Sequence, residues 1–218
     1  MFRKIFVCAV VFAAICLVGC GSEKIVGTAD KAVLAYAEIS MLGESDNMAA
    51  AGFSEDDKKE IRYRLANTFV DSMKPIAPLS EASAQEVTDL YFKHMKDKIT
   101  FRVTLKKDDA EHPIVDITTT PIDQTASAKL SAGNDEILSL IGMVGKLKSE
   151  GATDDQLKDN AEVQKLAVSA LSKYINNIQF QAEKTLEVPC KVMTGHDGKV
   201  HWAPANEEAF VNFLTGNS

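Results

Sequence analysis

The sequence predicts an α+β fold in which an antiparallel sheet of about four strands is packed on one face by several helices. Two pairs of segments alternate apolar and polar residues, which is the period of a strand with one buried face. Other segments repeat apolar residues at a spacing of three and four, which is the period of an amphipathic helix. Strands that are polar on one face need helices on the other, so the two patterns together indicate one layered core. The chain has 218 residues, enough for one sizeable core.

The first element is a leader. Two basic residues are followed by an apolar run over residues 5–18 that ends in Gly19 and Cys20. A membrane-spanning helix needs about 20 apolar residues. Because this run is shorter and ends in small residues, we interpret residues 1–19 as a signal peptide.

The end of the leader, Leu17-Val18-Gly19-Cys20, resembles the bacterial lipobox. The resemblance implies a lipoprotein signal peptide that is cut before Cys20, with acyl chains (palmitate or similar) on the Cys20 thiol and on its new amino group. Two or three acyl chains hold a protein on a bilayer without a spanning helix, since each buried CH₂ contributes about 0.8 kcal/mol. The expected partner is therefore the membrane, and residues 20–27 form a short tether. The expected location is the extracytoplasmic side of a bacterial cell membrane or outer membrane.

Charge and cysteine content narrow the function classes. Removal of Arg3 and Lys4 with the leader takes the formal net charge from −7 to −9. Nucleic-acid binding needs clustered Lys and Arg, so we expect no nucleic-acid partner. Of the four cysteines, two leave with the leader and Cys20 is lipidated. Only Cys190 remains, so no intramolecular disulfide is possible.

Residues 28–218 are interpreted as a single α+β domain that begins with three helices. Thr28 is placed to cap the first helix. Ser54 is followed by three acidic residues, which favour the positive end of a helix dipole. Ser83-Ala-Gln-Glu86 matches a capping box and opens the third helix.

A long helical segment spans about 123–178. It contains one helix over residues 134–149 and a second over 153–178. The second helix opens with a capping box at Thr153–Gln156 and carries a clear three-four repeat of apolar residues.

Two hairpins provide the strands. The first joins 99–106 to 114–119 through a polar loop, and the second joins 186–193 to 200–202. A short helix over 205–214 closes the chain.

The second hairpin, CKVMTGHDGKVHW, contains residue types that could act as a nucleophile, a base and an orienting carboxylate. A two-residue loop would place Trp202 opposite Met193 and put the apolar residues of the two strands on different faces. A three-residue loop, 196–198, places Val192 opposite Trp202, with Gly198 at the left-handed position of the bulge. We therefore interpret this stretch as a turn and not as an active site.

The three-residue loop separates the reactive groups. Cys190 then lies in the core, where a thiol is inert and its pKa rises. His196 lies on the loop and His201 on the solvent side, so neither is positioned to activate the thiol. We expect no catalytic residue and no enzyme activity.

The first hairpin loop is the strongest candidate for a metal site. It gathers four possible ligands but lacks the alternating acids and glycine of a calcium loop. No Gly-rich phosphate loop or paired-cysteine site is present. We therefore predict no metal and no cofactor. The four residues are Asp108, Asp109, Glu111 and His112.

The order of elements resembles the cystatin-like, nuclear-transport-factor-like superfamily, which includes bacterial lipoproteins that carry a domain of unknown function. The resemblance lies in the lipobox, in KITFRVTLKKDDAEHPIVDITTT, and in DGKVHW followed by Phe210 and Leu214. It implies a curved, cystatin-like sheet around a helix, often with a cone-shaped pocket. The helical stretch 123–178 is longer than that pattern.

The predicted function is a lipid-anchored, non-enzymatic binding or interaction module of the cell envelope. Its partner would be an unknown envelope protein or a small ligand. Two alternatives stay open: a protein with a pocket for a small apolar ligand, and an envelope hydrolase. The candidate pocket lining is Tyr91, His94, Phe101 and Trp202.

Overall fold

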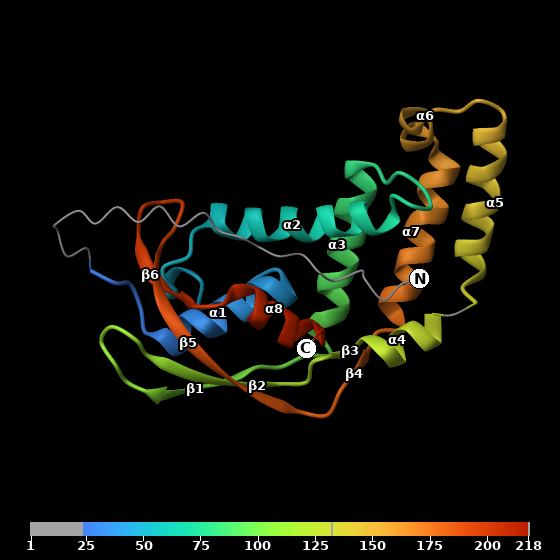
Figure 1. Ribbon diagram of the computed structural model, residues 1–218. Coiled ribbons are helices and arrows are strands. Elements are labelled where there is room, and N and C mark those ends of the chain that lie inside the picture. The colour runs from blue at the N-terminus through green and yellow to red at the C-terminus, as the bar shows by residue number, and fades with distance from the viewer. Residues whose placement is uncertain (1–23, 132, 218) are drawn as a thin grey trace. The chain divides into compact units, whose positions relative to one another are not determined.

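The computed structural model describes residues 24–131 and 133–217 (Figure 1). It has the predicted α+β class, with helices and a four-stranded antiparallel sheet. The elements in chain order are α1 (Ala29–Leu42), the 3-10 turn η1 (Ala49–Ala51), α2 (Glu55–Met73), α3 (Glu81–Lys96), β1 (Arg102–Lys107), β2 (Ile114–Thr119), β3 (Ile122–Asp123), α4 (Gln124–Ser131), α5 (Asp135–Ser149), α6 (Asp154–Asp159), α7 (Ala161–Asn176), β4 (Gln179–Phe180), β5 (Lys184–Thr194), β6 (Val200–Pro204) and α8 (Glu207–Thr215).

The described residues divide into two compact units. The first, the helical unit, comprises Arg62–Asp97 and Asp123–Gln179. The second, the sheet unit, comprises residues 24–61, Lys98–Ile122 and 180–217. The chain crosses between them within α2, after α3 and at the short paired strands β3 and β4.

The sheet unit is built on the strand order β1-β2-β5-β6, with every neighbouring pair antiparallel. Helix α1 packs against β1, β2 and β6 and lies across the sheet (Figure 1). Val115 and Ile117 of β2 are fully buried, and Val188 of β5 lies directly opposite Val115. The alternation seen in the sequence therefore produces one apolar face, which the helices cover.

The helical unit is organised around α7, which packs against α3 and α5. Its buried residues follow the three-four spacing of the sequence, from Val163 through Ala167 and Ala170 to Leu171. The Asn160 side chain accepts hydrogen bonds from the backbone N–H groups of Glu162 and Val163. The Thr153 capping box is confirmed, but it opens the separate short helix α6. The Asn160 cap starts α7 seven residues later, about two turns, so the helix expected over 153–178 is two helices.

Three other details differ from the sequence prediction. Ser80, not Ser83, is the N-cap of α3, and its hydroxyl accepts a hydrogen bond from the Ser83 N–H. Strand β1 begins at Arg102 rather than at residue 99. Elements of only a few residues, β3 and β4, carry too little periodicity to be read from the sequence.

The last residues of the expected tether take part in the fold. Val26 forms a parallel bridge with His201, and its N–H donates to the Val200 carbonyl over 2.7 Å. Gly27 follows at φ 73°, where an added Cβ would lie 2.6 Å from the Ala50 carbonyl oxygen. Cys20 and the lipobox lie outside the described residues.

Candidate functional site

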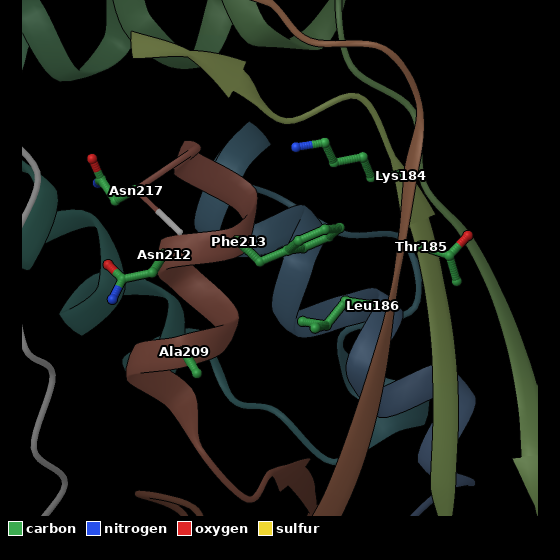
Figure 2. A pocket seen from close by; sticks show the side chains of 7 residues that line it. All are labelled: Lys184, Thr185, Leu186, Ala209, Asn212, Phe213 and Asn217. Carbon is green, nitrogen blue, oxygen red and sulfur yellow. The ribbon is translucent and has the colours of Figure 1, made fainter. Parts of the chain in front are cut away.

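An apolar groove of about 570 Å³ lies between β5 and α8 in the sheet unit (Figure 2). Leu186 of β5 and Phe213 of α8 point toward each other across it, while the Thr185 side chain points away from α8. The full lining is Lys184, Thr185, Leu186, Ala209, Asn212, Phe213 and Asn217.

Two contacts fix α8 as one wall of the groove. Glu207, in the first turn of α8, is buried; it accepts a hydrogen bond from the Tyr36 hydroxyl over 3.1 Å and pairs with Lys191 over 3.4 Å. At the other end, Gly216 caps α8 at φ 71°. A Cβ on Gly216 would lie 1.8 Å from the carbonyl oxygen of Ile122, so the chain approaches more closely there than any other residue allows.

The polar groups of the groove lie on its rim. Lys184 is the one charged residue of the lining, and its ammonium donates to the Gln181 side-chain oxygen over 2.5 Å. Asn212 and Asn217 lie on the side of α8 away from β5 (Figure 2). The groove is therefore an apolar trough with a single positive charge on its rim, and sequence reasoning missed it as a site.

The second hairpin has the register that the sequence predicted. Val192 pairs with Trp202 and Thr194 with Val200, and Gly198 has φ 80°. Cys190 is 4% exposed, and burial raises the pKa of its thiol to about 12. A thiol in that environment carries almost no thiolate at neutral pH, which agrees with a packing role.

One prediction about this hairpin was wrong: His201 does not face solvent. It is 2% exposed, and its ring contacts the Phe53 ring with the centroids 4.4 Å apart and the planes tilted by 46°. Both faces of β6 are covered: Trp202 is buried, and Tyr36 of α1 and Phe53, in the segment after η1, lie beside His201. Burial lowers the pKa of His201, although Asp57 and Asp197 act in the opposite direction.

His201 borders a small cavity of about 20 Å³ that is also lined by Asp57 and Gly195. That volume corresponds to roughly one water molecule. The Nδ1 atom of His201 is buried and has no hydrogen-bond partner among the described residues. His196, at the turn, contacts the Glu60 carboxylate, so the two histidines of the hairpin contact α2 and its N-terminus and not Cys190.

The four residues named as pocket lining lie in different units. Tyr91 and His94 are on α3 of the helical unit, where Tyr91 is buried and His94 half-buried. Phe101 precedes β1 and is half-buried, and Trp202 on β6 is buried, both in the sheet unit. The two hollows described above are lined by other residues.

In the first hairpin loop, the Asp109 carboxylate is engaged by groups of the loop itself. Asp109 accepts hydrogen bonds from the N–H groups of Glu111 and His112 over 3.0 and 2.9 Å and pairs with Lys107. These contacts, the Lys107 ammonium first, lower the pKa of Asp109. Within residues 24–131 and 133–217, no three His, Cys, Asp or Glu side chains gather as a metal site. Over the same residues, no helix has the length and apolar content needed to cross a membrane.

Comparison with known proteins supports the fold only. No family model and no curated protein matches the sequence significantly. The chain is similar to a solved structure from Bacillus subtilis subsp. subtilis str. 168, described as a "putative lipoprotein (ycdA)", with a TM-score of 0.53 and 13% identity. The match covers 85% of this chain and 55% of the other, so this chain spans about half the length of that protein.

Proposed function

We propose that this chain is a lipid-anchored, non-enzymatic binding module on the extracytoplasmic side of a bacterial membrane, and that the groove between β5 and α8 holds its ligand. The observation that carries the binding proposal is the trough of about 570 Å³ with apolar walls and one ammonium group on its rim. Its volume falls within the range of about 300–1,000 Å³ typical of small-molecule sites.

The lining favours a small amphipathic ligand. Leu186 and Phe213 provide apolar contact for an aliphatic or aromatic body, and Lys184 attracts a carboxylate or phosphate head. The trough is open on one side, so part of the ligand stays in water. We therefore expect modest affinity, in the micromolar range or weaker.

The anchor rests on the resemblance of residues 17–20 to the lipobox. The second hairpin supports a role without catalysis. Burial raises the pKa of its thiol, and its two histidines contact α2 and its N-terminus instead of that thiol. The Bacillus neighbour is described as a "putative lipoprotein", but at 13% identity it contributes only the fold.

Binding is tested on the chain from residue 24 onward, with dodecanoate as the anionic probe and dodecanol as the neutral one. Native mass spectrometry should detect one dodecanoate per chain. Ala209→Trp places a large side chain in the groove and should abolish the adduct, whereas Glu208→Trp, one exposed position away on α8, should leave it intact. Lys184→Gln should weaken dodecanoate about tenfold and leave dodecanol unchanged.

Equal binding by the Ala209→Trp and Glu208→Trp variants would exclude this groove as the site. Circular dichroism of each variant separates a filled groove from a failure to fold. The anchor is tested separately in cells, where Cys20→Ala should move the full chain out of the detergent-extracted membrane fraction or leave it uncleaved.

A further inference from the structure

Helix α5 has two apolar faces, and the described residues cover only one of them. Leu140 and Val144 are buried on the side that packs against α7, which lies alongside α5 (Figure 1). On the opposite side, Leu138 is 63% exposed and Ile141 is 48% exposed. An amphipathic surface helix normally places polar residues there, so this second apolar face is unusual.

The exposed face also carries both glycines of α5. A Cβ added at Gly142 or Gly145 would meet nothing within 4 Å. Glycine weakens the interior of a helix relative to alanine, and here it allows no close approach within the described chain. The two glycines, with Leu138 and Ile141, form a shallow surface that we call the α5 outer face.

We propose that the α5 outer face pairs with the α5 outer face of a second copy of this chain, with the two helices antiparallel. The two-fold axis would pass between Ile141 and Gly142. A residue before the axis in one copy then lies opposite the residue equally far after the axis in the other copy, so the surface is self-complementary. Leu138 of each copy then packs beside Gly145 of the other. Ile141 meets its symmetry mate on one flank, and Gly142 meets its own mate on the other.

Charge supports the antiparallel arrangement. Asp135 lies in the first turn of α5 and Lys146 in the last. In the proposed pair, Asp135 of one copy and Lys146 of the other lie on the same flank of the interface. They are offset along the helix axis by about two residues. The two helix dipoles also run in opposite directions, which is favourable.

A second copy fits this face better than a lipid surface does. Glycines offer no apolar area to acyl chains, whereas they let two helix backbones approach closely. A 15-residue helix buries less area than a stable soluble dimer requires. We therefore expect weak pairing in solution and stronger pairing when chains are concentrated on one membrane, as the proposed anchor would do.

The test is disulfide cross-linking of the full chain in membranes of the expressing cells. In the proposed pair, the two Cα atoms at position 142 are roughly 5–6 Å apart at an interaxial distance of about 8 Å, which suits a disulfide. Gly142→Cys should give a dimer on non-reducing gels under mild oxidation. Ser139→Cys, exposed on another face of the same helix, should give at least fivefold less.

A second variant tests the packing itself. On the Gly142→Cys background, Gly145→Leu fills the space that Leu138 of the other copy needs and should abolish the cross-link. Ser139→Leu on the same background should leave it unchanged. Equal cross-linking at positions 142 and 139, or a cross-link that survives Gly145→Leu, would overturn the proposal. A Cβ at Gly142 or Gly145 meets nothing within 4 Å, so both substitutions fit within the described chain.

Discussion

The carboxylate of Asp57 accepts a hydrogen bond from the backbone N–H of His196 over 3.1 Å, although the two residues are 139 positions apart. The same carboxylate accepts hydrogen bonds from the Ser54 N–H and hydroxyl, each over 2.7 Å. One buried side chain therefore caps the N-terminus of α2 and holds the turn of the second hairpin.

Asp57→Ala should lower the free energy of unfolding by about 2–3 kcal/mol, because it removes a charged acceptor and leaves N–H groups unpaired. Urea unfolding followed by circular dichroism measures the change. The matched control is Asp56→Ala, which removes an exposed pair with Lys59 and one first-turn acid of α2 and should destabilise the chain less than Asp57→Ala does. Equal effects of the two variants would contradict the bridging role of Asp57.

Stability should fall in acid because of His201. Burial lowers the pKa of His201 in the folded chain below the unfolded value of about 6.5, so the unfolded chain binds the proton more readily. The free energy of unfolding that comes from keeping His201 neutral is fully present above pH 6.5. It is lost as the pH falls below that value, at up to about 1.4 kcal/mol per pH unit. Between pH 7.5 and pH 5.0, the free energy of unfolding measured in urea should fall less for His201→Gln than for the wild type. A parallel loss in both proteins would refute this assignment.

The second hairpin shows how far sequence reasoning reaches. Parity fixed the pairing of Val192 with Trp202, because a shift of one residue would have moved every apolar side chain to the other face. Parity could not show that Tyr36 and Phe53 would cover the face of His201, because that contact depends on α1 and η1, which are far away in the sequence.

The groove was beyond sequence reasoning for a similar reason. The sequence predicted a strand over residues 186–193 and a helix over residues 205–214. It did not place Phe213 opposite Leu186, because this placement depends on the close approach of Gly216 to Ile122 and on the buried Glu207. Fold class followed from local periodicity, whereas the groove follows from tertiary contacts.

Gly216→Ala should destabilise the sheet unit more than Gly198→Ala does. Both glycines have positive φ, so each substitution costs about 1 kcal/mol from backbone conformation. Only at Gly216 does the new Cβ clash with a backbone oxygen, 1.8 Å away, which should add about 2 kcal/mol or more. Thermal unfolding of the two variants gives the comparison, and similar melting temperatures would argue against the tight contact.

Cys190 should react slowly with a thiol reagent in the folded chain. It is 4% exposed and its pKa is raised to about 12, so little thiolate is available at pH 8. Ellman's reagent should modify it at least a hundredfold faster in 6 M guanidinium. Rapid modification under native conditions would show that the hairpin opens or that the thiol is not in the core.

Mass spectrometry of the mature N-terminus decides whether the chain is lipid-anchored through Cys20. We expect the full chain, expressed in bacteria, to start at Cys20 and to carry a diacylglyceryl group on the thiol, with or without a third acyl chain on the amino group. An unmodified N-terminal peptide, or one that begins at a residue other than Cys20, would show that the chain is not anchored in this way.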